Sequence, residues 1–181
     1  ATGTDAAGNA ITAAPTSGAT ITVDNTAPTA ALAYTISSSA VSTVKQNDVV
    51  TLTATFTEDI SDSPVMQISG SGVETISAAD MTKASATSYT YSWTVPAGDG
   101  TQTFALATGT DAAGNAITAA PTSGATITVD NTAPTASLAY TISSSAVSNV
   151  KQNDVVTLTA TFNENIADSP VMQISGSGVE T

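Results

Sequence analysis

The fold is indicated by the stretch Val49-Val50-Thr51-Leu52-Thr53-Ala54-Thr55-Phe56, in which apolar side chains alternate with threonines. Successive side chains of a β-strand point to opposite faces, so this pattern gives one apolar face for a core and one threonine face for solvent. The same alternation recurs at residues 32–36, 89–95 and 125–129. The pattern therefore predicts half-buried strands and an all-β protein.

Turn-forming clusters such as Gly70-Ser71-Gly72 and Pro96-Ala97-Gly98-Asp99-Gly100 separate the alternating stretches. About seven strands in about a hundred residues predict a β-sandwich of the immunoglobulin type, with Trp93 in its core. Residues 77–81 are expected to form at most one helical turn. The strands are expected at residues 31–37, 49–57, 64–69, 73–76, 87–95, 101–109 and 124–130.

The chain repeats itself at a spacing of 106 residues. Residues 1–75 and 107–181 align without a gap and are identical at 70 of 75 positions. A period of this length corresponds to one domain per repeat rather than to the short units of solenoids. Such near-identity is typical of a domain that is copied in an array to provide length and spacing. The five differing pairs are Ala31/Ser137, Thr43/Asn149, Thr57/Asn163, Asp59/Asn165 and Ser61/Ala167.

The joint between repeats is the sequence Asp24-Asn25-Thr26-Ala27-Pro28-Thr29, which returns at residues 130–135. A short joint that contains proline is stiff. We therefore expect the last strands of a preceding repeat at 1–27, a complete repeat at 28–133, and the first three strands of a following repeat at 134–181. Because both ends fall within a repeat, the sequence is expected to be a window of a longer, secreted chain.

Charge and composition exclude several classes of function. The chain has three lysines and no arginine, histidine or cysteine against 15 acidic residues, giving a net charge of −12. Nucleic acids and anionic membranes attract clustered cations, so neither is an expected partner. No apolar run is long enough to span a bilayer. Imidazole and thiolate catalysis, disulfides and thiolate metal sites are excluded too. We expect the chain not to be an enzyme.

In a sandwich with this strand order, three acidic segments should meet at one end of the complete repeat. They are the joint at 24–29, the loop at 57–63 and the loop at 110–124. Up to five carboxylates without a lysine would repel one another, whereas a bound Ca²⁺ takes about six to eight oxygens from flexible loops. The expected cofactor is therefore Ca²⁺. The candidate ligands are Asp24, Asn25, Glu58, Asp59, Asp62, Asp111 and Asn115.

The alternative is that these residues only shape turns. Aspartate and asparagine are frequent in turns because their side chains bond the nearby backbone. The sequence has neither an EF-hand loop nor a glycine-rich calcium nonapeptide. In the following repeat Glu164 remains, but Asn165 replaces Asp59 and still offers an oxygen. The residues alone leave both interpretations open.

Three motifs occur in order within one period: VDNTAPT at 23–29, FTEDI at 56–60 and TDAAGN at 110–115. Together they resemble the tandem bacterial immunoglobulin-like repeats of giant surface adhesins, including biofilm-associated and RTX-type adhesins, over the whole period. The resemblance implies a stalk that projects ligand-binding domains from the cell and is stiffened by Ca²⁺ at its joints. It implies ligands at Asp24, Glu58 and Asp111, at Asp130 and Glu164 in the next junction, and at Asp5 in the preceding one.

The leading hypothesis is a structural spacer of a secreted or cell-surface bacterial adhesin, whose partners are the neighbouring repeats of the same chain. A second is a unit of a self-assembling extracellular fibre or biofilm-matrix filament, in which copies of the chain complete one another by β-strand addition. A carbohydrate- or ice-binding module is a third, since threonine-rich strand faces are flat, although threonine also suits strands in general. An enzyme with Glu58 and Asp111 as an acid–base pair is least favoured.

Overall fold

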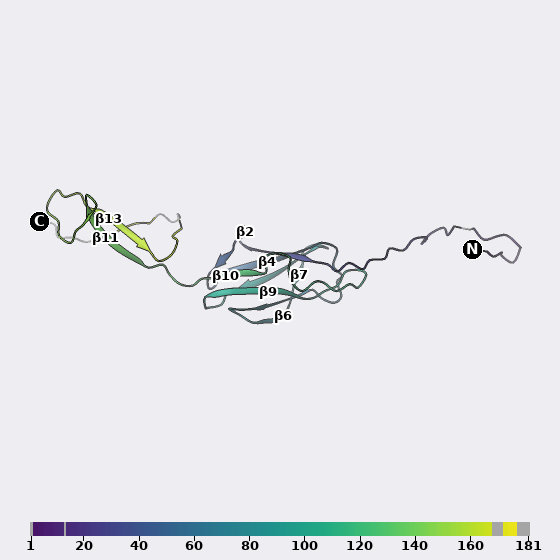
Figure 1. Cartoon of the computed structure of the whole chain (residues 1–181). Coiled ribbons are helices and arrows are strands. Elements are labelled where there is room, and N and C mark those ends of the chain that lie inside the picture. The colour runs from purple at the N-terminus through teal and green to yellow at the C-terminus, as the bar shows by residue number, and fades with distance from the viewer. Residues whose placement is uncertain (1, 13, 168–171, 177–181) are drawn as a thin grey trace. The chain divides into compact units, whose positions relative to one another are not determined.

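The structure is a computed structural model that describes residues 2–12, 14–167 and 172–176. The described residues form strands and turns and no helix, which confirms the all-β class. The chain divides into two compact units, Ala1–Asn131 and Thr132–Thr181 (Figure 1). This division lies two residues before the boundary expected from the sequence, and it does not separate residues 1–27 from the complete repeat. Among the described residues, no helix has the length and hydropathy that crossing a membrane requires.

The first sheet of the complete repeat is centred on β4 (Val49–Phe56). Its strand order is β2-β1-β4-β8-β7, and all of its pairings are antiparallel. Leu52 in the middle of β4 pairs with Tyr34 on one side and with Tyr91 on the other. The side chains predicted to point inward from β4 are buried, as the alternation requires. The other strands are β1 (Ala30–Ile36), β2 (Ser39–Ala40), β7 (Thr82–Lys83) and β8 (Ser88–Thr94).

The second sheet has the strand order β3-β10-β9-β5-β6. β3 and β10 are parallel, and the other pairings are antiparallel. Because β2 belongs to the first sheet and β3 to the second, the chain crosses between the sheets within a few residues. The strands are β3 (Thr43–Val44), β5 (Gln67–Ser71), β6 (Ile76–Asp80), β9 (Gly100–Thr108) and β10 (Thr126–Val129).

The two sheets pack face to face around an aromatic cluster. The ring centroid of Phe104 on β9 lies 5.9 Å from that of Tyr34 on β1 and 5.4 Å from that of Trp93 on β8. Trp93 and Phe104 meet at 81°, the edge-to-face geometry that aromatic pairs favour. Burial of apolar surface at roughly 25 cal/mol per Å² is the main stabilising term of such a core. The complete repeat is thus sandwich-like, and the predicted core position of Trp93 is confirmed.

The strands differ from the expected ones in the middle of the repeat. Residues 77–81 form no helical turn, because β6 occupies Ile76–Asp80 instead of the expected 73–76. The backbone before β6 is held by the buried side chain of Gln102. Gln102 accepts a hydrogen bond from the Glu74 N–H at 2.8 Å and donates to the Glu74 carbonyl at 2.9 Å. A side chain therefore takes the place of a neighbouring strand there. The short strands β2, β3 and β7 were not expected either.

The unit Thr132–Thr181 repeats the first strands of the complete repeat. β11 (Ala136–Ile142) lies between β12 (Ser145–Ala146) and β13 (Thr157–Phe162). Its pairings have the registers of the complete repeat, since Leu138 pairs with Ala160 as Leu32 pairs with Ala54. Near-identical sequence thus gives identical local pairing.

Candidate metal centre

Three carboxylates from three separate segments meet in the complete repeat. Oxygens of Asp24, Glu58 and Asp111 all lie within 4.8 Å of one another. Asp111 is buried, and Asp24 and Glu58 are half-buried. The segments are the joint, the loop after β4 and the loop after β9, which are the three that the strand order was expected to bring together. We call these residues the three-carboxylate group.

Asp24 is placed by hydrogen bonds of the joint. Its Oδ1 accepts from the N–H of Thr26 at 2.9 Å, an Asx turn. Farther along the joint, the carbonyl of Thr29 accepts from the N–H of Thr57 at 3.0 Å. The joint is therefore fastened to the end of β4, next to the loop that carries Glu58.

Glu58 lies in a loop that is anchored by its neighbours. Ile60 is buried and forms an isolated bridge with Asp111. The N–H of Ser61 donates to the carbonyl of Thr110 at 2.8 Å. The two loops are thus paired directly. Sequence reasoning missed the anchoring role of Ile60, although a single apolar residue within an acidic loop is a signal for it.

The carboxylate of Asp111 is oriented by Asn115. The backbone N–H and the side-chain Nδ2 of Asn115 donate to the two carboxylate oxygens of Asp111, each at 2.8 Å. Gly114 has a φ of +94° in this turn, a conformation that favours glycine. Nδ2 also donates to the backbone carbonyl of Asp24 at 3.1 Å. Asn115, which was expected to be a ligand, thus makes contacts that position Asp111 and the joint.

The same turn forms at Asp5 in the preceding copy. Asn9 donates from its N–H and from its Nδ2 to the Asp5 carboxylate, both at 2.9 Å. Hydrogen bonds from Asn9 lower the pKa of Asp5, led by the one from its side chain. The turn therefore closes through its own residues. A role in the turn and a role in a metal site are compatible, because each carboxylate oxygen has more than one lone pair.

The charges of Asp24 and Asp111 influence the ionisation of Glu58. Burial, and then the charges of Asp24 and Asp111, raise the pKa of Glu58. Burial acts to raise the pKa of Asp111 too, but hydrogen bonds from Asn115 and from the neighbouring backbone together lower it. Of these two groups, Glu58 is therefore the first to take up a proton as the pH falls.

A hard divalent cation fits this group of ligands. Oxygens bound to one Ca²⁺ lie about 2.3–2.6 Å from it and hence no more than about 5 Å from one another, a limit that the 4.8 Å separation meets. Among the described residues, the lysine ion pairs are Lys45–Asp48 at 3.3 Å and Lys83–Asp62 at 2.5 Å, and neither involves the group. Three carboxylates offer three oxygens if each binds through one oxygen and six if each binds through both, whereas Ca²⁺ takes about six to eight. Backbone carbonyls or water would supply the remaining ligands.

The remaining predicted ligands lie outside the group. Asn25 and Asp59 are exposed, and Asp62 is paired with Lys83. For the next junction, the N–H of Asp130 donates to the carbonyl of Val44 at 2.9 Å. Oε1 of Glu164 is buried without a hydrogen-bond partner among the described residues. Asp130 and Glu164 belong to different compact units, so each is described only within its own.

In comparisons with known proteins, no family model, no curated protein and no solved structure matches the chain.

Proposed function

We propose that the complete repeat is a calcium-binding, immunoglobulin-like spacer domain of an extracellular stalk. The observation that carries the proposal is the convergence of Asp24, from the joint, with Glu58 and Asp111, from two loops of the repeat. An ion bound by all three would tie the joint to the repeat. Because the joint is the connection to the preceding copy, movement of one repeat against the other would then be restricted.

The strand arrangement supports the immunoglobulin-like part of the proposal. Without the two-residue strands, seven remain, and the first, second and fifth (β1, β4 and β8) share a sheet. The third, sixth and seventh (β5, β9 and β10) share the other. Immunoglobulin-type sandwiches divide these strands in the same way. β6 departs from the constant-type arrangement, because it pairs with β5 instead of joining the first sheet.

The repetition supports a structural role rather than a catalytic one. A copied domain adds length without adding new chemistry. The longest strand, β9, has nine residues and spans about 30 Å, so each further repeat would lengthen a stalk by roughly 30–40 Å. We therefore favour a spacer, in which the number of copies sets the reach.

We place this stalk on the bacterial cell surface, in an adhesin, because its motifs resemble the repeats of that class. Extracellular calcium modules bind at about 10⁻⁴–10⁻³ M, a weak range that suits a site with three carboxylates. The chain has no cysteine, so its stability does not depend on disulfides.

Calorimetry with Ca²⁺, and with Mg²⁺ for comparison, tests the metal site on the 181-residue chain. We expect one Ca²⁺ per complete repeat, and unfolding that is harder by about 1.4 kcal/mol for each tenfold excess of free Ca²⁺ over the dissociation constant. Small-angle scattering of a chain with several complete repeats tests the stiffening. A scattering profile that is the same in millimolar Ca²⁺ and in chelator would refute the proposed mechanism.

A further inference from the structure

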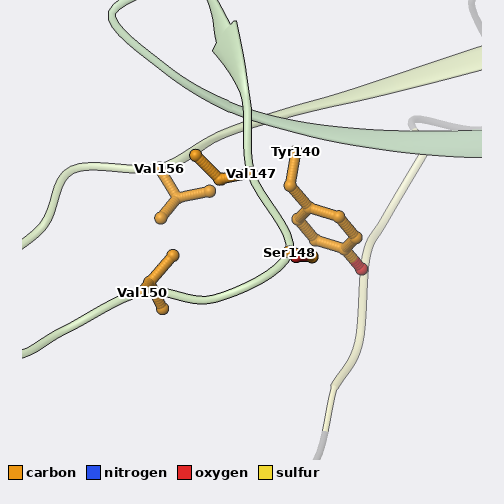
Figure 2. A pocket seen from close by; sticks show the side chains of 5 residues that line it. All are labelled: Tyr140, Val147, Ser148, Val150 and Val156. Atoms are coloured by element: carbon orange, nitrogen blue, oxygen red, sulfur yellow. The ribbon is translucent and has the colours of Figure 1, made fainter.

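An apolar groove lies open on the unit Thr132–Thr181. It is lined by Tyr140, Val147, Ser148, Val150 and Val156 and has a volume of about 400 Å³. Figure 2 shows the three valines and the Tyr140 ring gathered around one hollow. Tyr140 is 49 % exposed and Val150 is 58 % exposed. Large apolar side chains that are exposed together mark a surface to which a partner binds.

In the complete repeat the same positions are covered. Tyr34, Val44 and Val50 each stand 106 residues before a residue of the groove, and they are between 0 and 6 % exposed. The cover includes the segment 122–130, which contains β10. Within it, the backbone of Thr128 donates to the Ser42 carbonyl at 3.1 Å.

This covering segment is held along its length. Val129 pairs in parallel with Val44, and the Tyr34 hydroxyl donates to the Gly124 carbonyl at 2.7 Å. Ile127 and Val129 point into the core and are only 2 % and 1 % exposed. The segment thus closes the sandwich by hydrogen bonds and by two apolar side chains.

A second copy of the covering segment is present in the chain. Residues 16–24 and 122–130 have the same sequence, Thr-Ser-Gly-Ala-Thr-Ile-Thr-Val-Asp. In the first copy, Ile21 is 90 % exposed and Val23 is 77 % exposed. The chain therefore carries both an open groove and an exposed copy of the segment that covers such a groove.

We propose that residues 16–24 of one molecule bind the groove of a second copy of this chain. The same interface already exists within the complete repeat, where residues 122–130 cover the positions equivalent to the groove. Segment 16–24 lies 106 residues before that segment and the groove lies 106 residues after those positions, so the pairing partners follow directly. Val23 then pairs in parallel with Val150, and the Gly18 carbonyl accepts from the Tyr140 hydroxyl. Ile21 and Val23 cover the apolar lining.

Association of this kind is head-to-tail, because segment and groove are different surfaces of each molecule. Such contacts continue from copy to copy, as an open filament or, where the rotation between copies closes, as a ring. Where a further repeat follows in the same polypeptide, its own copy of the segment would compete for the groove. The groove contains none of the three-carboxylate group, and the segment shares with that group only Asp24, its last residue. Association and calcium binding are therefore measured separately.

Sedimentation velocity of the 181-residue chain over a concentration series tests the proposal, with chelator and with Ca²⁺. We expect self-association that grows with concentration in both conditions. Ile21→Asp should weaken it about tenfold or more, because a carboxylate would be buried against the apolar lining. Thr22→Asp adds the same charge at a position whose counterpart Thr128 is exposed, and should leave association largely unchanged.

A second matched pair tests the groove itself. Val150→Asp should weaken association as Ile21→Asp does. Asn149→Asp should not, because its counterpart Thr43 is exposed in the complete repeat. None of the four substitutions lies within residues 28–131, so the thermal unfolding of the complete repeat serves as the folding control. A peptide with the sequence of residues 16–24 should compete with association.

Three results would overturn the proposal. The first is a chain that stays monomeric at every concentration, and the second is association that Ile21→Asp leaves unchanged. The third is a compaction that Ile21→Asp abolishes but that does not depend on concentration, because segment and groove would then meet within one molecule. Calcium binding is a separate readout, so its loss with association intact would refute only the proposed function.

Discussion

The side-chain amide of Asn115 donates a hydrogen bond to the backbone carbonyl of Asp24 over 3.1 Å and so connects the loop after β9 to the joint. The same nitrogen donates to the buried carboxylate of Asp111 at 2.8 Å. One amide thus orients one carboxylate and also positions the segment that carries another. The joint is therefore fastened to the repeat without an ion, and a bound ion would reinforce an existing connection.

Asn115→Ala should weaken calcium binding by about tenfold or more, because groups that orient a ligand tune the affinity of a site by this amount. Asn9→Ala is the matched control. Asn9 makes the same contact to Asp5, which lies outside the three-carboxylate group. Titration calorimetry of both variants measures the difference. Equal affinities would show that the contact from Asn115 has no part in binding.

Glu58→Gln should remove most of the stabilisation that Ca²⁺ provides, whereas Asp59→Asn should not. Both changes remove one negative charge from the same loop, but only Glu58 belongs to the three-carboxylate group. The following repeat already carries Asn165 at the position of Asp59. Thermal unfolding in Ca²⁺ and in chelator measures the effect. If the calcium-dependent shift were the same in both variants, Glu58 would not be a ligand.

The response of the metal-free protein to pH follows from the raised pKa of Glu58. The folded state holds this proton more tightly than the unfolded chain, whose pKa is near the usual value of 4.5. The resulting stabilisation is complete below pH 4.5 and is lost as the pH rises through the raised pKa of Glu58 in the folded state. In chelator, the unfolding temperature of the unsubstituted protein should therefore fall, relative to that of Glu58→Gln, as the pH rises through this window. Parallel curves for the two proteins would contradict the shift.

Two glycines at the same position of the repeat should respond differently to substitution. Gly124 and Gly18 have similar φ angles of +69° and +67°. A Cβ at Gly124 would overlap the carbonyl oxygen of Leu32, whereas one at Gly18 meets nothing within 4 Å. Gly18→Ala should lower the free energy of unfolding by about 1 kcal/mol, the cost of a side chain at a left-handed φ. Gly124→Ala should lower it by about 2 kcal/mol more, because the overlap with Leu32 is added to that strain. Urea unfolding, followed by the fluorescence of Trp93, measures both. A neutral Gly124→Ala would show that the segment can move away from β1.

The strands were predictable where the signal is local. The period-two alternation of residues 49–56 gives both the strand and its buried face. The role of Gln102 was not predictable, because its side chain bonds the backbone of Glu74, which is 28 residues away in the sequence. A search for alternating apolar and polar residues assigns residues 73–76 to a strand. Such a search cannot detect that a distant side chain, instead of a neighbouring strand, bonds the backbone there.

The candidate site was predictable only in part for the same reason. The strand order brings the loops together, so the meeting of Asp24, Glu58 and Asp111 could be expected. Which carboxylate of the adjacent pair Glu58 and Asp59 joins them depends on how Ile60 is anchored. That bridge connects two loops that are distant in sequence, and no local pattern indicates it.

Strands from the two ends of the complete repeat run side by side in the same direction. Val44 of β3 pairs with Val129 of β10, and Ala31 of β1 bridges Ser123, which precedes β10, both in parallel. Tension applied through the two ends of the repeat would therefore pull these strands past each other along their length. Their hydrogen bonds would carry the load together, in shear, instead of being peeled apart one at a time. Pulling on single molecules measures this directly. Resistance to force would then be set by the direction of the end strands, and a repeat of only moderate thermodynamic stability could still hold under load.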